Sequence, residues 1–319
     1  MIGIGSRFTF TIVDLSVHPR RGCRLVPPRN VDLFSNVAVP ADGRTGRRYP
    51  RYVTEPRVRT EIEGPIAYVW LNRPDKLNGI ELDMLQGLLD AAAAIKRNRD
   101  VRVVILQGAG ESFCAGLDFA AAGKKPSRVV RFFVPNPFRG TNLFQQALWT
   151  WRELPVPVIA VTRGHVFGGG FQLAVAADFR FTTPDCQWSI LEAKWGLVPD
   201  MSGTVPLSEL VPADVAKRLV MTGEVFSGQQ AADHGLATGV ADDPMKPAME
   251  LVDALVARSP DSVSASKKLL NRSRRGGLRG AFGRERRYQL RMFRSPNTKV
   301  ARKAGMTKTE PNFGPRRFR

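Results

Sequence analysis

Hydrophobic and polar positions alternate in the first patterned part of the chain. Residues 58–63 and 66–71 both alternate, and Gly64-Pro65 lies between them. A period of two on either side of a turn dipeptide predicts a β-hairpin. From 80 to 98 the apolar residues recur at helical spacing, and an apolar run at 101–107 follows. This strand–helix–strand order predicts a parallel sheet with a right-handed crossover.

Helical and strand patterns continue along most of the remaining chain. Helical spacing or helix-start signals occur at 144–153, 207–210, 215–221, 226–232, 249–258 and 262–272, and strand patterns occur at 156–161, 179–183, 187–190 and 235–240. Ser227 is the expected N-cap of the helix that begins there. Residues 120–142 show little pattern and are expected to form a loop. The sequence therefore predicts an α/β protein.

A glycine-rich segment, 164–172, follows one buried strand and precedes an apolar helix. Consecutive glycines allow a ligand to approach the main chain closely, and the first N–H groups of a helix have no partner within the helix. A second strand, 103–108, also runs into small residues before Leu117. Two such strand ends side by side would direct two N–H donors at one carbonyl oxygen, as in an oxyanion hole. A glycine turn that only allows tight packing is the alternative interpretation.

Four motifs in order resemble the crotonase (enoyl-CoA hydratase/isomerase) superfamily over roughly residues 57–300. They are Asn72 to Asn78, Phe113 to Asp118, Gly164 to Gln172, and Glu192 with Gly196 to Asp200. The resemblance implies a crotonase-like spiral of ββα units with a C-terminal helical region that forms trimers. It also implies an acyl-CoA substrate, with coenzyme A as part of the substrate and no separate cofactor or metal.

The resemblance assigns roles to individual residues. It implies that the backbone N–H groups of Leu117 and Gly169 form the oxyanion hole. It implies coenzyme A contacts at Arg73, Lys76, Leu77 and Ala115, with Lys267 and Lys268 as weaker candidates for phosphate contacts. Asp118 follows Leu117 at an expected helix start, where a carboxylate caps free N–H groups.

Family hydratases use two glutamates, and this chain keeps one of them. Glu192 matches the second glutamate, whereas Gln172 occupies the position of the first. An amide cannot exchange a proton at neutral pH, although it can hold a water molecule or a substrate oxygen. Asp200 is either the missing second carboxylate or the N-cap of the next helix. The predicted catalytic set is therefore Glu192, Gln172 and Asp200.

Charge is concentrated at the two ends of the chain. The net charge of +19 comes from residues 1–56, with nine basic and four acidic residues, and from residues 271–319, with sixteen basic and two acidic. The residues between them are neutral. The basic C-terminal region is expected to meet coenzyme A phosphates, to bind a polyanion such as RNA, or to be a solvated and partly disordered tail.

We predict three parts: a basic and disordered extension at 1–51, a crotonase core at 52–255, and a C-terminal helical region with a basic tail at 256–319. Three cysteines without paired spacing favour a reducing compartment, and no apolar run approaches membrane-spanning length. We expect a cytoplasmic protein, or a mitochondrial one if the extension is a transit peptide. A start-site error is a third interpretation of the extension.

The functional prediction is an enoyl-CoA hydratase/isomerase that works through an oxyanion hole and one glutamate, as a homotrimer or a dimer of trimers. The alternatives are another enolate reaction, such as thioester hydrolysis or decarboxylation, and a catalytically weak acyl-CoA-binding or RNA-binding protein. The basic ends favour the RNA alternative, and Gln172 favours the weak catalyst.

Overall fold

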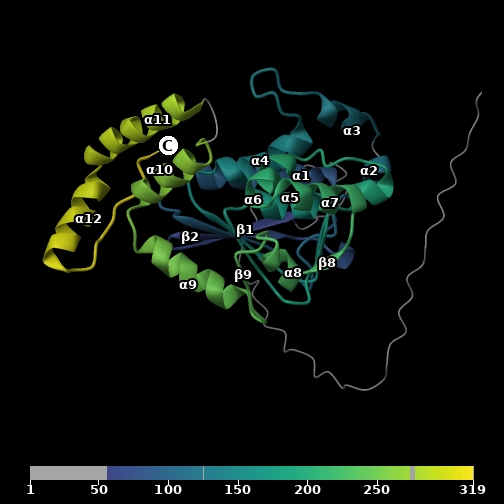
Figure 1. Ribbon diagram of the computed structural model, residues 1–319, viewed down its shortest axis with the longest axis horizontal. Coiled ribbons are helices and arrows are strands. Elements are labelled where there is room, and N and C mark those ends of the chain that lie inside the picture. The colour runs from purple at the N-terminus through teal and green to yellow at the C-terminus, as the bar shows by residue number, and fades with distance from the viewer. Residues whose placement is uncertain (1–55, 125, 274–276, 319) are drawn as a thin grey trace, which may run out of the picture. The chain divides into compact units, whose positions relative to one another are not determined.

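The structure is a computed structural model that describes residues 56–124, 126–273 and 277–318 (Figure 1). These residues belong to one compact unit that spans Val53–Arg319. Residues 1–51 lie outside the described residues, so the expected disordered extension and the boundaries of the three parts stay predictions. Helices and strands alternate through the first two thirds of the unit, which confirms the predicted α/β class.

The main sheet has six strands in the order β1-β2-β3-β4-β6-β9. They are Val58–Glu63 (β1), Ile66–Leu71 (β2), Val103–Gly108 (β3), Val158–Thr162 (β4), Phe179–Thr182 (β6) and Gly239–Val240 (β9). β1 and β2 form the predicted antiparallel hairpin, and every other neighbouring pair is parallel. Helix α1 (Leu82–Arg97) connects the parallel strands β2 and β3, which confirms the strand–helix–strand prediction.

Helices cover both faces of this sheet. Val104 and Leu106 of β3 belong to the core shared with α1, α4 (Leu143–Glu153) and α5 (Gly169–Ala176). Val103 and Ile105 face the other way, into the core that includes α9 (Met245–Val256). Because both faces are buried, the strand reads as a continuous apolar run instead of an alternating one.

A second sheet of three strands continues from β4. It consists of β5 (His165–Phe167), β7 (Gln187–Ser189) and β8 (Phe226–Ser227). Helices α6 (Thr204–Leu210), α7 (Ala213–Thr222) and α8 (Gly228–Asp233) follow the turn after β7. Ser227 caps α8, and the Gln230 side chain accepts a hydrogen bond from the Ser227 N–H in return, which confirms the predicted cap.

The loop prediction for residues 120–142 is wrong in part. Residues Phe119–Gly123 form α2 and residues Pro126–Phe133 form α3. Helix α3 fully buries none of its side chains, although Phe132 and Phe133 pack against Phe144 of α4. Two turns of helix give too few repeats for a periodic pattern to stand out, and this segment is stabilised mainly by contact with α4.

The basic C-terminal region folds into helices. Helices α10 (Pro260–Leu270), α11 (Gly277–Phe293) and α12 (Pro296–Thr307) are followed by a segment that returns to the core. Buried Asp261 of α10 fixes the position of this last segment. Its carboxylate accepts hydrogen bonds from Ser295 Oγ and from the backbone N–H groups of Arg317 and Phe318, each at 2.6 Å. The alternative of a disordered tail is therefore wrong for residues 277–318.

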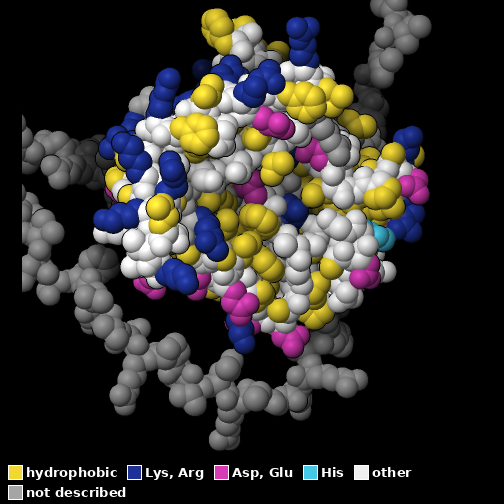
Figure 2. All heavy atoms as spheres, turned by 60° about the vertical axis from the view of Figure 1, so that its left-hand side comes forward, with side chains coloured by type: hydrophobic (Ala, Val, Ile, Leu, Met, Phe, Trp, Pro, Cys, Tyr) yellow, Lys and Arg dark blue, Asp and Glu magenta, His cyan; other side chains and the backbone are white. Residues whose placement is uncertain are grey.

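Figure 2 shows the face on which α10, α11 and α12 come forward, with dark blue Lys and Arg side chains around a hollow that hydrophobic side chains line.

The described ranges contain no helix that is both long enough and apolar enough to cross a membrane.

A buried ion pair attaches α10 to the main sheet. Lys267 Nζ lies 2.6 Å from Asp178 Oδ2 and donates a hydrogen bond to the Val156 carbonyl oxygen at 2.9 Å. Asp178 in turn accepts a hydrogen bond from the N–H of Val158, the first residue of β4. Removing one partner of a buried pair leaves an uncompensated charge, which is far more costly than losing an exposed pair.

We therefore expect Lys267→Met to lower the free energy of unfolding by about 3–5 kcal/mol. The double variant Lys267→Met/Asp178→Asn should recover part of that loss, because no unpaired charge remains. Urea denaturation of both variants measures the difference, with exposed Lys246→Met on α9 as the control. Equal losses in Lys267→Met and Lys246→Met would show that the pair does not stabilise the fold.

Candidate active site

Beyond the carboxyl end of β3, the chain around Cys114 runs alongside β5. The N–H of Cys114 donates to the His165 carbonyl at 2.8 Å, and the N–H of Phe167 donates to the Cys114 carbonyl at 3.0 Å. Cys114 and Val166 therefore pair as a short parallel bridge. Ligands of open α/β sheets bind outside the carboxyl ends of the strands, and this is such a place.

Glycines permit this close approach. A Cβ atom added to Gly170 would lie 2.5 Å from the Cys114 carbonyl oxygen, so no side chain fits there. Gly168 has φ 50° and ψ −115°, a conformation that L-residues with a side chain rarely adopt. Gly116 has φ 95°, and a Cβ atom there would lie 3.0 Å from the Phe167 carbonyl oxygen. The glycine-rich segment therefore does more than end a strand, because it brings two loops into backbone contact.

The two predicted N–H donors lie on these segments. Leu117 lies between two backbone hydrogen bonds, from Ile80 N to Gly116 O and from Asp118 N to Ile80 O. Gly169 is the first residue of α5, where the helix leaves N–H groups without internal partners. Within the described ranges, neither the Leu117 nor the Gly169 N–H donates to a protein acceptor. Both are available to an oxygen of a ligand.

Glu192 faces the glycine turn from η2 (Leu191–Trp195). A Cβ atom added to Gly168 would lie 3.6 Å from Glu192 Oε1, so the carboxylate lies directly beside the start of α5. Its other oxygen, Oε2, is buried and has no hydrogen-bond partner among the described residues. Burial raises the pKa of Glu192, hydrogen bonds from its own backbone N–H and from Gln172 oppose this, and the negative charge of Asp200 adds to the rise.

Gln172 connects Glu192 to the segment before α6. Its side chain is buried, and Nε2 donates to Glu192 Oε1 at 2.6 Å. Its Oε1 accepts from the N–H groups of Met201 at 2.9 Å and Gly203 at 3.0 Å. These donors determine which end of the amide is oxygen, so the amide nitrogen must face Glu192. Gln172 therefore orients Glu192 and stabilises its charged form.

Asp200 is not the N-cap of the following helix, so that alternative is wrong. Helix α6 begins at Thr204 and its N-cap residue is Gly203, three residues beyond Asp200. Asp200 is half-buried, and desolvation raises its pKa. The negative charge of Asp200 also contributes to the raised pKa of Glu192.

Of the residues predicted to contact coenzyme A, some lie at the surface beside the candidate site and others are buried in ion pairs. Leu77 and Ala115 are joined by a hydrogen bond from Ala115 N to Leu77 O at 2.9 Å, and Lys76 beside them is exposed. Arg73 instead turns inward, where its Nη1 lies 2.7 Å from Asp118 Oδ2 and also donates to the Gly79 carbonyl. A phosphate-binding role of the Arg73 side chain conflicts with this burial. Lys267 is likewise buried in its ion pair with Asp178.

Two structural roles complete the site. Asp118 caps α2 by accepting a hydrogen bond from Ala121 N, as predicted. Asn78, to which no sequence pattern gave a role, is fully buried and donates to the carbonyls of Ala109 and Ser112. Asn78 has φ 55°, and its side chain fixes the loop that carries Leu117. Asparagine tolerates the left-handed region better than most residues, which was the available signal.

Comparison with known proteins gives consistent matches. The sequence model described as enoyl-CoA hydratase/isomerase matches residues 61–315. Carnitinyl-CoA dehydratase of Salmonella typhi is 35% identical over 212 residues, which cover 65% of this chain and 77% of the relative. Enoyl-CoA hydratase EchA19 of Mycobacterium tuberculosis is 30% identical over 260 residues, covering 81% of this chain and 96% of the relative.

Solved structures agree with these relatives. The crystal structure of an enoyl-CoA hydratase from Mycobacterium tuberculosis H37Rv has a TM-score of 0.73 at 29% identity and covers 82% of this chain and 99% of that chain. That of an enoyl-CoA hydratase from Bacillus anthracis has a TM-score of 0.74 at 25% identity, covering 81% and 98%.

The raised pKa of Glu192 has a consequence for stability. A carboxyl group whose pKa is higher in the folded state than in the unfolded state favours unfolding as the pH rises from the unfolded to the folded pKa. We therefore expect Glu192→Gln to raise the melting temperature more at about pH 8 than at about pH 4, as measured by circular dichroism. Exposed Glu250→Gln on α9 is the control. A Glu192→Gln variant that melts like the wild type at both pH values would contradict this.

Proposed function

The chain belongs to the enoyl-CoA hydratase/isomerase family and has the crotonase fold, and we propose that it moves a double bond within an unsaturated acyl-CoA. The family comprises enzymes of the lyase and isomerase type, and the named relatives are enzymes of this kind. The observation that supports isomerisation is the pairing of Gln172 with Glu192, because it leaves Glu192 as the one carboxylate beside Gly168 among the described residues.

In this proposal, the thioester oxygen binds the N–H groups of Leu117 and Gly169. These donors stabilise the negative charge that develops on the oxygen, and the helix dipole of α5 contributes in the same direction. Both N–H groups have no protein acceptor among the described residues, so an incoming oxygen displaces no existing hydrogen bond. The acyl carbons next to the thioester then lie near Glu192, which borders Gly168.

Glu192 transfers the proton. In a 3-enoyl thioester, its carboxylate removes a proton from the carbon next to the carbonyl, and the electrons move onto the thioester oxygen as a dienolate. The same proton returns to the fourth carbon, the double bond moves to the second carbon, and Glu192 is again ionised. No atom is gained or lost. A base with a raised pKa is well suited to this, because it accepts and returns the proton with similar ease.

Hydration is the second candidate, and Asp200 favours it. Addition of water requires a second group that handles a proton, and Gln172 cannot supply one. Asp200 is a half-buried carboxylate with a raised pKa whose charge reaches Glu192. Coenzyme A enters as part of the substrate in both cases, so we propose no separate cofactor.

Exposed apolar side chains are consistent with an acyl substrate and with a trimer. Phe119 of α2 and Trp195 of η2 pack together at 5.5 Å between ring centroids and are both exposed. They flank the segments that carry Leu117 and Glu192, where an acyl chain would pass.

On α11, Leu290 and Phe293 are more than half exposed, as expected of a surface that neighbouring subunits cover in the proposed homotrimer.

We expect Glu192→Gln to lower isomerisation of a 3-enoyl-CoA by about 10² to 10⁴-fold, because a general base contributes a factor of that size. Product mass and thioester absorbance measure the turnover. Glu250→Gln, which removes an exposed carboxylate on α9, should leave the rate unchanged. If Glu192→Gln keeps full turnover, Glu192 is not the base and Asp200 becomes the carboxylate to replace.

Gln172→Glu separates the two candidate reactions. A glutamate at this position can keep the hydrogen bonds from Met201 and Gly203, but its second oxygen would then lie against Glu192 Oε1. Two carboxylates this close share a proton, so the isomerase should lose activity at neutral pH. A product heavier by one water, formed faster than by the wild type, would instead identify a hydratase. Gln172→Ala is less informative, since it leaves two buried N–H groups unpaired.

A further inference from the structure

A second concave site lies at the opposite ends of the strands. A cavity of about 520 Å³ is bounded by the end of α1, the end of α4 and the end of α10. Its walls come from residues before β3 and β4, whereas the candidate active site lies beyond the carboxyl end of β3. It is therefore separate from the site that holds Glu192.

Basic side chains dominate this cavity, which we call the basic pocket. It is lined by Lys96, Arg97, Arg99, Lys268, Arg272 and Arg316, together with Arg152 and Lys267. Arg152 and Lys267 have carboxylate partners, Glu209 and Asp178. Glu153 is the one acidic residue among the described residues that line the pocket. The lining therefore carries a large excess of positive charge.

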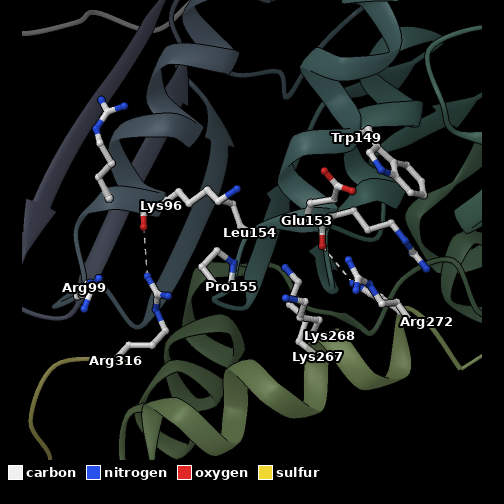
Figure 3. Close-up of a pocket in the computed structure, with 13 residues that line it drawn as sticks. Lys96, Arg99, Trp149, Glu153, Leu154, Pro155, Lys267, Lys268, Arg272 and Arg316 are labelled. Carbon is white, nitrogen blue, oxygen red and sulfur yellow. Dashed lines mark hydrogen bonds between the residues drawn. The ribbon is translucent and has the colours of Figure 1, made fainter. Parts of the chain in front are cut away.

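The basic groups come from distant parts of the chain and converge on Leu154 and Pro155. Figure 3 shows Lys96, Arg99 and Arg316 on one side of Pro155, and Lys268 and Arg272 on the other. Lys96, Arg99 and Arg272 are exposed, and none of the three forms an ion pair within the described ranges.

Arg316 is the buried member of this group. Only 3% of its surface is exposed, and its two terminal nitrogens donate to the carbonyls of Phe318 and Lys96. Its Nε is buried and has no hydrogen-bond partner among the described residues. A buried Nε–H group without a protein acceptor favours an acceptor, from water or from a ligand, beside the guanidinium.

Positive neighbours destabilise the charged forms of two of these groups. Burial lowers the pKa of Lys268, and the positive charges of Arg272, Arg291, Lys96 and Arg287 lower it further. Burial also lowers the pKa of Arg316, with a further contribution from Arg99 that Asp261 partly opposes. Like charges held at this density favour the binding of a multiply charged anion, which would convert repulsion into attraction.

We propose that the basic pocket binds the polyphosphate group of a nucleotide. Arginine matches phosphate oxygens with its planar set of donors, and several arginines balance the several charges of a di- or triphosphate. The volume is within the range of small-ligand sites, about 300–1,000 Å³. Trp149, Leu154 and Pro155 add apolar surface to the lining, against which a nucleoside can pack. A nucleic-acid strand would need an extended groove instead of one compact pocket.

The test uses the full-length protein in titration calorimetry at constant ionic strength. The probes are tripolyphosphate, ATP and adenosine 3′,5′-bisphosphate, which corresponds to the nucleotide end of coenzyme A. The variant is Lys96→Ala/Arg272→Ala, since both residues are exposed and their loss should not disturb the fold. The control is Lys217→Ala/Lys246→Ala, which removes two exposed charges outside the pocket.

We expect the wild type to bind tripolyphosphate and the pocket variant to bind it at least about tenfold more weakly, with the control within about twofold. ATP that binds more tightly than the bisphosphate assigns the pocket to a free nucleotide, and the reverse assigns it to the coenzyme A end. Without ligand, the pocket variant should melt at a higher temperature than the wild type because repulsion is relieved. Equal weakening in both double variants would mean general attraction to a basic protein. That result, or no binding by the wild type, would overturn the proposal.

A short RNA oligomer is the last probe. If RNA binds more tightly than every small phosphate and loses affinity equally in both double variants, the basic surface as a whole is the binding site and the pocket is not.

Discussion

The candidate active site depends on the close contact of two backbone segments, 114–117 and 166–170. Gly170 allows α5 to approach the Cys114 carbonyl to a distance that no side chain permits, and Gly168 adopts a conformation reserved for glycine. With these two conditions met, the Leu117 and Gly169 N–H groups lie on adjacent segments without protein acceptors in the described chain. The packing of α5 on the core and the availability of the two donors therefore have the same physical origin.

Gln172 shows how an amide changes the electrostatics of this family site. Its side chain donates to Glu192 and accepts from two backbone N–H groups. The amide favours ionised Glu192, while burial and Asp200 oppose ionisation. The balance leaves Glu192 with a raised pKa and with one oxygen, Oε2, that has no hydrogen-bond partner among the described residues, as the proposed proton transfer requires.

Positive charge has two roles in the C-terminal region. Lys267 is buried, paired with Asp178 and structural, whereas the next residue, Lys268, lies among like charges in the basic pocket. Both residues line the basic pocket, but Lys267 is neutralised by Asp178 and Lys268 is surrounded by like charges. Charge counting alone locates the excess at the two ends of the chain. Only the folded arrangement shows which cations neutralise carboxylates and which gather around a cavity.

Local chemistry was enough to predict the hairpin, α1 and the Ser227 cap, since each depends on residues close together in sequence. The motif order also gave the family and the positions of Glu192, Gln172, Leu117 and Gly169. Features that rest on distant partners were missed or wrong: α3 packs on α4, Arg73 pairs with Asp118, and Asp200 does not cap α6. The sequence by itself determined the hairpin, most of the later strands and helices, and the family to which the chain belongs. Only the tertiary structure decided which side chains meet, because ion pairing and desolvation depend on distance in space and not along the chain.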